Sequence, residues 1–378
     1  MSLVLDEHRA YLADTPRLDA FDAALRALVR PGDIVLDLGS GTGILGLLAC
    51  RAGARRVYAI EMGSIAELAR DIARANGFGE RFIAVQDVST RITLPEPVDL
   101  IVMDAAGRFG FDGGGVETLS DARRRFLKND GRIIPGAITL SVAPCDAADA
   151  IDHIAFWSRP VHGLSFAAAS TIARNTGYPR RIAAHELAAA PADIAAFDPS
   201  RQTAPFTGRA SCRVDRQTIV HGIAGWFTAA LAPGVTLTNA PGAPHRIDRR
   251  NVFLPLSKAV AVEPGDVVGT RLTIDPIAVM LRWRVEIASA DGRVRHATDA
   301  STFHGMLMSR DDLRRTRPDF VPVLTAAGRA RKTILDLCDG AHPVADIEAE
   351  VERRHASLFA TPAAVAVFVA EVLTRYAE

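Results

Sequence analysis

Short apolar runs alternate with longer amphipathic runs between residues 33 and 145. The apolar runs are rich in Val, Ile and Leu, and they include DIVLDLG, RVYAIEM, FIAVQD, VDLIVMDA and RIIPGAITLSV. Helix-like segments such as ILGLLACRAG stand between them. Buried strands that alternate with helices are typical of βαβ units, whose parallel sheet binds ligands at the carboxyl ends of its strands. We therefore expect an α/β domain over residues 1–145.

From about residue 205 the pattern changes to short segments in which apolar and polar residues alternate. These segments are ASCRVDRQ, VTLTNAP, NVFLPL, VVGTRLTI, LRWRVEIASADG and RHATDAST. Gly, Pro and Asp-Gly turns separate them, as in antiparallel sheets. An Ala-rich region, roughly 146–204, is expected to be helical, with ELAAAPADIAAFDP as a connector. We assign residues 146–308 to a second domain.

The last part of the chain has a helical period. Patterns over 326–337, 344–354 and 362–376 are separated by helix breakers. Their apolar residues recur at helical spacing, which indicates an ordinary packed core. These residues are Ile334, Leu337, Ile347, Val351, Val365, Val369 and Leu373. We expect a small helical or winged-helix unit over residues 309–378.

Composition limits the possible functions. With 378 residues, 48% of them apolar and 23% charged, the chain has the length of two or three globular domains. Because 44 basic and 44 acidic residues cancel, no global charge attracts nucleic acid or a membrane surface. The four cysteines form no metal-binding pattern, and neither a signal peptide nor a membrane span is recognisable. We expect a cytoplasmic protein without a metal site.

A glycine-rich loop follows the first predicted strand. Residues 34–38 run into Gly39-Ser40-Gly41-Thr42-Gly43, and an apolar helix begins at Ile44. Such a loop lets a ligand approach the backbone and the free N–H groups of the helix N-terminus. The third glycine comes one residue early for a dinucleotide fingerprint, and the Gly-Lys-Ser/Thr of a P-loop is missing. Glu61 ends the next strand, where a carboxylate can accept both hydroxyls of a ribose.

Together with Asp37, LDLGSGTG and Glu61 resemble the S-adenosyl-L-methionine site of class I methyltransferases. The resemblance implies this cofactor, with S-adenosyl-L-homocysteine as its product. It places Asp87 and Val88 beside the adenine, although an acid after a strand is also a common helix cap. A glycine turn with a solvated Glu61 is the alternative. The implied binding residues are Asp37, Gly39, Ser40, Gly41, Gly43, Glu61, Met62, Asp87 and Val88.

Over about residues 5–308 the chain resembles the protein arginine methyltransferase family. The resemblance rests on VLDLGSGTGILGLLACRAGARRVYAIEMGSI, DLIVMDAAGRFGFDGGGVETLSDARRRFLKNDGRIIP, HGIAGWFTAAL and PHRIDRRNVFLPL, in this order. It implies a Rossmann-like sheet followed by an antiparallel β-barrel. It also implies a helical dimerisation arm at about residues 170–191 and a head-to-tail homodimer.

The same resemblance assigns three further residues. Arg17, in LADTPR, matches the arginine that holds the methionine carboxylate, a bidentate task suited to a guanidinium. Asp14 and His245 match a carboxylate–histidine pair near the acceptor. The alternatives for this pair are a helix cap and a surface histidine.

The sequence departs from the family where the acceptor is held. A guanidinium must be gripped by two glutamates before its nitrogen can attack a methyl group. Here Asp104 replaces the first glutamate, Gly113 stands in place of the second, and Asp112 is expected to point away. Arg108 and Arg246 replace aromatic residues, and solvated rim positions are the alternative for both.

These departures predict an acceptor other than guanidinium. We expect a peptide or protein carboxylate, oriented by Arg108 and Arg246; for a neutral acceptor, Asp104 or the Asp14–His245 pair could take a proton. An arginine N-methyltransferase, a small-molecule O- or N-methyltransferase and a non-catalytic cofactor-binding protein remain alternatives.

The C-terminal stretch resembles the winged-helix peptide-binding domains of ribosomal-peptide tailoring enzymes. The similarity lies in FVPVLTAAGRARKTILDLCDGAHPVADIEAEVERRH and AAVAVFVAEVLTRY. It implies recognition of a peptide substrate. A helical cap on the barrel and a nucleic-acid-binding unit are the other readings, but residues 340–378 carry six acids against three bases, which discourages phosphate contact.

Overall fold

The computed structural model describes residues 4–307, 309–315 and 317–377. The chain divides into two compact units, Met1–Met306 and Leu307–Glu378. The first unit contains a parallel sheet and two antiparallel sheets, and the second is helical in its described residues. The predicted fold class is confirmed. The predicted boundary near residue 145 lies inside the first unit and stays a prediction.

A five-stranded parallel sheet with the order β3-β2-β1-β4-β5 forms the first half of this unit. Its strands are β1 (Ile34–Leu38), β2 (Arg56–Glu61), β3 (Phe82–Gln86), β4 (Val98–Met103) and β5 (Leu127–Ile134). Its helices are α1 (Val4–Ala13), α2 (Thr15–Leu28), α3 (Ile44–Arg51), α4 (Ile65–Ala75) and α5 (Gly115–Phe126). All five residues of β1 are buried, as the apolar pattern predicts. The strand order changes direction between β1 and β4, and such switch points bind ligands at the carboxyl edge of the sheet.

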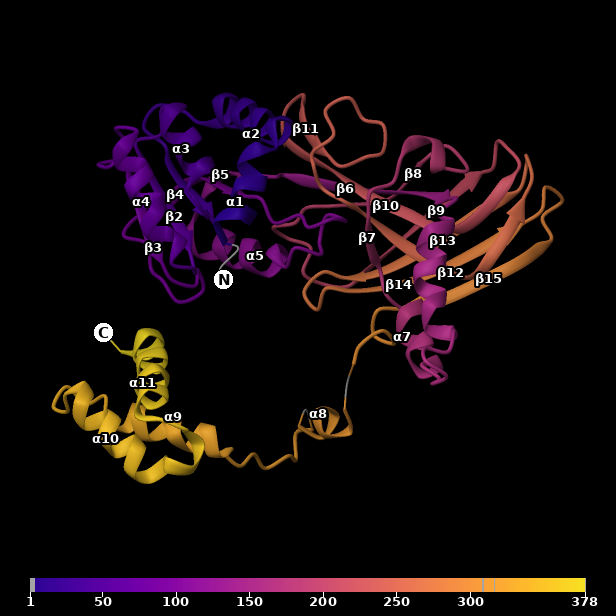
Figure 1. Cartoon of the computed structure of the whole chain (residues 1–378). Helices are drawn as coiled ribbons and strands as arrows, with labels where there is room; N and C mark the ends of the chain where they lie inside the picture. The colour runs from indigo at the N-terminus through magenta and orange to yellow at the C-terminus, as the bar shows by residue number, and fades with distance from the viewer. Residues whose placement is uncertain (1–3, 308, 316, 378) are drawn as a thin grey trace. The chain divides into compact units, whose positions relative to one another are not determined.

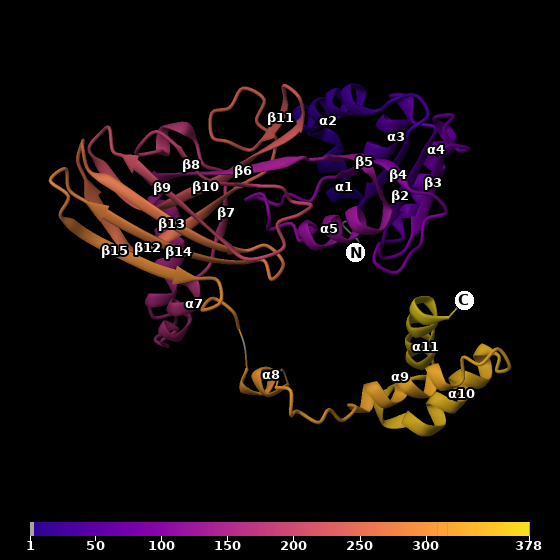
Figure 2. The same cartoon turned by 180° about the vertical axis from the view of Figure 1, so that it is seen from behind.

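Two antiparallel sheets form the second half, and Figures 1 and 2 show them as curved layers beside the parallel sheet. The six-stranded sheet has the order β7-β12-β10-β6-β8, with β11 beside β10, and the four-stranded sheet has the order β15-β14-β13-β9. The six-stranded sheet contains β6 (Ala137–Cys145), β7 (Tyr178–Arg180), β8 (Ala192–Phe197), β10 (Thr218–Ala232), β11 (Val235–Thr238) and β12 (Asn251–Val262). The other contains β9 (Phe206–Arg213), β13 (Val267–Asp275), β14 (Met280–Ala288) and β15 (Val294–Ser301). Inward residues such as Trp283 and Leu272 are fully buried, so the alternating pattern is explained by a shared core.

A helical segment projects from the antiparallel sheets, as Figure 1 shows around α7. It consists of α6 (Ala148–Ala155), η1 (Phe156–Ser158), η2 (Ala167–Ala169) and α7 (Ser170–Arg174), and we call it the arm. The predicted range, about 170–191, contains only α7 of this segment. The rest of the predicted range is not part of the arm. It contains β7, η3 (Ala184–Glu186) and part of the connection to β8.

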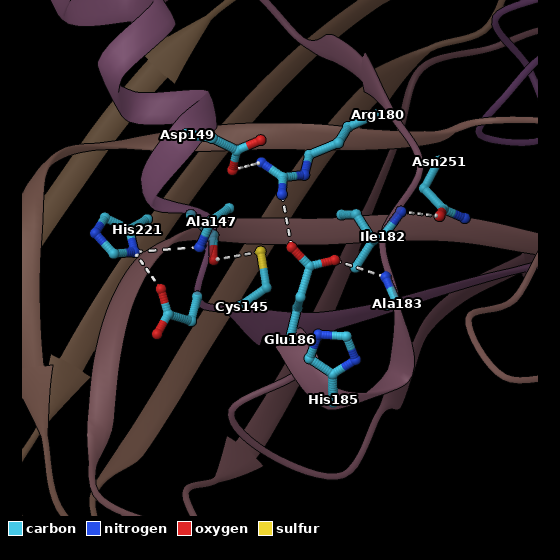
Figure 3. Close-up of polar contacts among 12 residues, drawn as sticks. Cys145, Ala147, Asp149, Arg180, Ile182, Ala183, His185, Glu186, His221 and Asn251 are labelled. Atoms are coloured by element: carbon cyan, nitrogen blue, oxygen red, sulfur yellow. Dashed lines mark hydrogen bonds and ion pairs between the residues drawn. The ribbon is translucent and has the colours of Figure 1, made fainter.

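A partly buried polar cluster fixes the base of the arm (Figure 3). Arg180, from β7, forms ion pairs with Asp149 on α6 and, at 2.6 Å, with Glu186 on η3. The other oxygen of Glu186 accepts a hydrogen bond from the Ala183 backbone at 2.7 Å. Cys145 and His221 lie nearby, but burial raises the pKa of the Cys145 thiol far above its usual value. This cluster is therefore a structural anchor and not a nucleophilic site.

The second unit contains α8 (Arg310–Arg315), α9 (Ala326–Asp336), α10 (Val344–His355), η4 (Ala356–Leu358) and α11 (Pro362–Tyr376). Its core consists of Ile334, Ile347, Val351, Val365, Val369 and Val372, with Leu337 and Leu373 packed against them. Between residues 309 and 377, in the parts that are described, no strand is assigned, so the wing of a winged helix is not formed there. In the described chain no single helix is long and apolar enough to span a membrane. One pair of helices, Val344–Leu358 and Pro362–Thr374, has the length and composition of a span when taken together, but the pair is bent by 114°.

Candidate active site

The glycine loop joins β1 to α3 in a conformation that requires glycine. Gly41 and Gly43 have φ angles of 55° and 83°, which L side chains rarely adopt. A Cβ at Gly41 would lie 2.6 Å from the ring of His8, and one at Gly43 would lie 2.7 Å from Phe82. The loop therefore presents bare backbone at the carboxyl edge of the sheet, beside the N-terminus of α3.

Glu61 is held against this loop at the end of β2. Its Oε2 accepts a hydrogen bond from the Gly41 backbone at 3.0 Å, and its Oε1 accepts one from Gly63 at 2.8 Å. The parallel register places Glu61 opposite Gln86, so Asp87 begins the next loop beside it, and the Asp87 N–H donates to the Glu61 carbonyl at 3.1 Å. A carboxylate fixed in this way can receive the two hydroxyls of a ribose.

Asp37 and Ser40 have buried polar atoms without partners. Oδ2 of Asp37 accepts from the Gly46 backbone at 2.8 Å, but its Oδ1 and the Oγ of Ser40 have no hydrogen-bond partner in the described protein. Burial raises the pKa of Asp37 to about 7. Buried polar atoms are normally satisfied, so a polar ligand is expected here. The arrangement fits the polar amino-acid and ribose ends of S-adenosyl-L-methionine.

The glycine loop and Ser40 border one cavity, and Asp37 and Glu61 lie outside its lining. It is lined by His8, Tyr11, Leu12, Arg17, Gly39, Ser40, Gly41, Thr42, Ile44, Leu45 and Asp104. Helix α1 thus covers the glycine loop, and Arg17 and Asp104 belong to the same lining. Asp87 is engaged by the Val88 backbone and by Arg91, while Met62 and Val88 are exposed. Those three positions lie beside Glu61, outside the cavity lining.

Asp104 follows β4 and is buried between two arginines. Nε of Arg17 lies 2.5 Å from Oδ2 of Asp104, and Nη2 of Arg249 lies 3.1 Å from the same oxygen. The Asp104 side chain is only 6% exposed. Burial alone would raise the pKa of Asp104, but the charges of Arg249 and Arg17 outweigh it and lower that pKa below its usual value. Asp104 is therefore an ionised carboxylate whose lone pairs are largely occupied.

A second cavity shares Tyr11 and Asp104 with the first. It is lined by Tyr11, Asp104, Ala105, Gly107, Arg108, Asp112, Gly113, Asp248, Arg249 and Arg250. Asp112 turns back to its own loop and accepts from the Arg108 and Phe109 backbones at 2.6 and 2.7 Å. At Gly113 a Cβ would lie 2.1 Å from the Ala105 carbonyl oxygen. This loop therefore has no room for a second acid at position 113.

The structure does not bring Asp14 and His245 together. The carboxylate of Asp14 caps α2 at the Arg17 backbone, 3.4 Å away, and accepts from the Asp248 backbone at 2.9 Å. His245 is exposed and makes no hydrogen bond or ion pair with the described residues. In this structure Asp14 is a helix cap and His245 a surface histidine, and their pairing near an acceptor stays a prediction.

Arg246 also lies away from the second cavity. Its guanidinium donates to the Ile182 carbonyl at 3.0 Å and to Oδ1 of Asn251 at 2.8 Å. The arginine at Asp104 is Arg249, which the sequence reasoning missed together with Tyr11. Arg249 lies in the irregular stretch just before β12, where residues 251–256 are all buried, so no alternation in the sequence marks it.

A Rossmann-like sheet with this glycine loop, Glu61 and a buried acid after β4 defines a class I S-adenosylmethionine-dependent methyltransferase. Residues 21–134 match the family model of ribosomal protein L11 methyltransferase (PrmA). The chain is 30% identical over 275 residues to the arginine N(omega)-methyltransferase of Streptomyces achromogenes subsp. streptozoticus, covering 70% of this chain and 75% of that protein. It is 28% identical over 281 residues to protein arginine N-methyltransferase 1 of Chlamydomonas reinhardtii, covering 72% and 81%.

Solved structures agree on the fold. Protein arginine methyltransferase 10 of Arabidopsis thaliana superimposes with a TM-score of 0.69 at 23% identity, covering 79% of this chain and 98% of that one. A Trypanosoma brucei PRMT1 enzyme–prozyme heterotetrameric complex with AdoHcy gives 0.70 at 23% identity, covering 78% and 97%. The chain belongs to the protein arginine methyltransferase-like family. It is an enzyme that uses S-adenosyl-L-methionine as methyl donor.

Proposed function

We propose that this enzyme methylates a side chain of a peptide or protein in the second cavity. The observation that supports this most directly is the position of Asp104 and Tyr11, which line both the cofactor cavity and the second cavity. The cofactor supplies an electrophilic methyl group. The protein's part is to hold it through Glu61 and Arg17, to position the acceptor in line, and to exclude water.

The first candidate acceptor is an arginine side chain. It is supported by the relatives, which are named as arginine methyltransferases. In this reading Asp104 binds the guanidinium of the substrate arginine. At least one of its present partners, Arg17 or Arg249, must then release the Asp104 carboxylate. Arg17 is the one with an alternative partner, because the methionine carboxylate of the cofactor would compete for its guanidinium.

The second candidate is a carboxylate, and a specific observation favours it. Asp104 carries one buried negative charge beside the two guanidinium groups of Arg17 and Arg249. Elsewhere in the cavity lining, Arg108 and Arg250 are offset by Asp112 and Asp248. The local excess of positive charge at Asp104 repels a cationic acceptor and attracts an anionic one. A carboxylate is ionised at pH 7 and needs no general base.

A chemical test separates these acceptors. Enzyme and labelled S-adenosyl-L-methionine are incubated with matched arginine-rich and glutamate-rich peptides, and the products are treated with mild base. Label released as methanol identifies a carboxyl ester, and base-stable label on nitrogen identifies arginine.

Two variants provide the mechanistic control. For an arginine acceptor, Asp104→Asn should lower kcat/KM at least ~100-fold, because the only acid shared by both cavities is lost. For a carboxylate acceptor, Arg249→Gln should cause the larger loss, because an anchoring cation disappears. Loss of cofactor affinity in either variant would show that the effect lies in the cofactor cavity instead.

We also propose that the enzyme is a homodimer that acts in ribosomal peptide tailoring. The arm supports the dimer, because four large apolar side chains on it are exposed: Phe156, Trp157, Leu164 and Phe166. Exposed apolar patches of this kind mark protein interfaces. The similarity of the second unit to peptide-binding domains supports the peptide substrate.

A cytoplasmic location completes this proposal. All four cysteines are free thiols, and Cys338 is exposed. An exposed thiol is retained most readily in a reducing compartment.

A further inference from the structure

The outer face of the four-stranded sheet carries a row of three arginines. Strand pairing places Arg209 of β9 opposite Arg271 of β13, and Arg271 opposite Arg284 of β14. All three alternate with buried neighbours, so their side chains point outward. We call these three residues the arginine row.

The arginine row is unfavourable for the fold alone. Directly opposite residues hold their Cβ atoms about 5 Å apart, and like charges at that spacing destabilise a sheet. Arg284 is compensated by Glu286 at 2.6 Å. The side chains of Arg209 and Arg271 make no hydrogen bond or ion pair with any part of the chain that the structure describes. Two guanidinium groups thus remain available to an external partner.

A hollow adjoins these groups. It is lined by Arg209, Ala210, Gly269, Thr270, Arg271, Arg284 and Glu286, with a volume of about 250 Å³. Gly269 creates the space, because it points outward and has no side chain. A Cβ there would meet only the Glu286 carbonyl oxygen, at 3.8 Å, so the backbone does not require glycine at this position.

We propose that the arginine row and this hollow bind an acidic polypeptide segment, through its Asp or Glu carboxylates. A guanidinium matches a carboxylate in a bidentate geometry, and the hollow gives room for the approaching chain. The site does not depend on the methyl-transfer proposal, because it lies on the outer surface of a different sheet from the one that bears Asp104 and the glycine loop.

Charge and composition favour a polypeptide over a nucleic acid. Glu286 and Asp299 lie among the arginines on the same face, where they would repel a continuous phosphate backbone. The outward residues of β13 and β14, strands that are described throughout, include no aromatic side chain on which bases could stack. The carboxylates of a polypeptide are spaced irregularly, so they can contact the arginines while avoiding Glu286 and Asp299. A regular row of phosphates cannot avoid both acids.

The test measures binding without turnover. A short fluorescein-labelled polyglutamate peptide is titrated with the full-length enzyme at low salt, and its anisotropy is recorded. Arg209→Gln with Arg271→Gln should weaken binding about tenfold, and added salt should weaken wild-type binding to a similar degree. The melting temperature of this double variant should be equal to or higher than that of the wild type, because like-charge repulsion is removed.

The matched control removes two arginines elsewhere. Arg30 and Arg293 are exposed and lie off the sheet face, so Arg30→Gln with Arg293→Gln should leave the peptide affinity unchanged. No binding by the wild-type enzyme, or equal losses in both double variants, would overturn the proposal. So would competition by a short RNA that depends on the same arginines, since it would identify a nucleic-acid site. Methyltransferase activity does not enter either result, so failure here leaves the acceptor question open to its own test.

Discussion

The buried cluster of Asp104, Arg17 and Arg249 determines how the active site can work. Two cations surround one anion, and both arginine side chains are at most 14% exposed. Buried charges are tolerated only when they are paired, and removing one partner is strongly destabilising. Any acceptor or cofactor group that binds the Arg17 guanidinium therefore changes the charge balance at Asp104. In the proposed function, this coupling links cofactor binding at Arg17 to the electrostatics of the second cavity.

Asp37 should make the stability of the enzyme depend on pH. Folding raises its pKa from 3.8 to about 7, so the folded state keeps a proton that the unfolded chain has lost. The resulting stabilisation is fully present below about pH 3.8 and is lost as the pH rises through about 7. We expect the unfolding free energy of Asp37→Asn, relative to wild type, to increase by about 2–3 kcal/mol between pH 5 and pH 8.

Urea unfolding at both pH values measures this difference. Asp130→Asn, at an exposed position, serves as the control and should run parallel to wild type. Parallel curves for Asp37→Asn as well would contradict a raised pKa in the unliganded enzyme.

Residues near regular strands could be predicted, and residues on long connections could not. Gly39, Gly41 and Glu61 follow strands directly, so local pattern places them at the sheet edge. His245 and Arg246 lie on the irregular connection between β11 and β12, where nothing in the sequence defines which side chain turns inward. Arg249 became recognisable only once the start of β12 was known.

At the level of elements, tertiary pairing overrode local preference in two places. The stretch ELAAAPADIAAFDP is rich in alanine and was expected in a helical region, yet Ala192–Phe197 forms β8 and pairs with β6. RIIPGAITLSV was expected as one strand but is divided at Pro135 and Gly136 into β5 and β6, which belong to different sheets. Partners that supply the hydrogen bonds of these strands are far away in sequence, so no local pattern could reveal them.

The arm gives a prediction at the same scale. Phe156 and Trp157 pack edge to face with ring centroids 5.4 Å apart and are 48% and 36% exposed. If they form the dimer interface, Phe156→Ser with Trp157→Ser should convert the dimer to a monomer, because interface aromatics contribute most of the binding energy. Light scattering coupled to size-exclusion chromatography measures the mass of both proteins.

Exposed apolar residues elsewhere provide the comparison. Ile219 and Val294 are 45% and 55% exposed on the antiparallel sheets, and Ile219→Ser with Val294→Ser should leave the mass unchanged. A dimer that survives the arm substitutions would exclude the arm as the interface.

At the scale of the whole molecule, zero net charge conceals an uneven distribution. Guanidinium groups concentrate around Asp104 and along the arginine row, while residues 340–378 are acidic overall. Composition alone showed that the chain has no net charge, but it could not reveal where the arginines gather. In the second unit α9, α10 and α11 were predictable, because their apolar residues repeat at helical spacing.

The second unit should contribute to acceptor binding and not to cofactor binding. Val351 is fully buried in its small core, so Val351→Asp places an unpaired carboxylate there and should unfold this unit. We expect the KM for a peptide acceptor to rise at least ~10-fold, with kcat and cofactor affinity nearly unchanged, because uniform binding is lost. Val367→Asp introduces the same charge in the same unit, on α11, at a position that is 69% exposed, and it should behave like wild type. Steady-state kinetics and calorimetric titration with S-adenosyl-L-homocysteine measure the two effects separately. An unchanged KM in Val351→Asp, with loss of this unit's helical signal in circular dichroism, would rule out a role in peptide recognition.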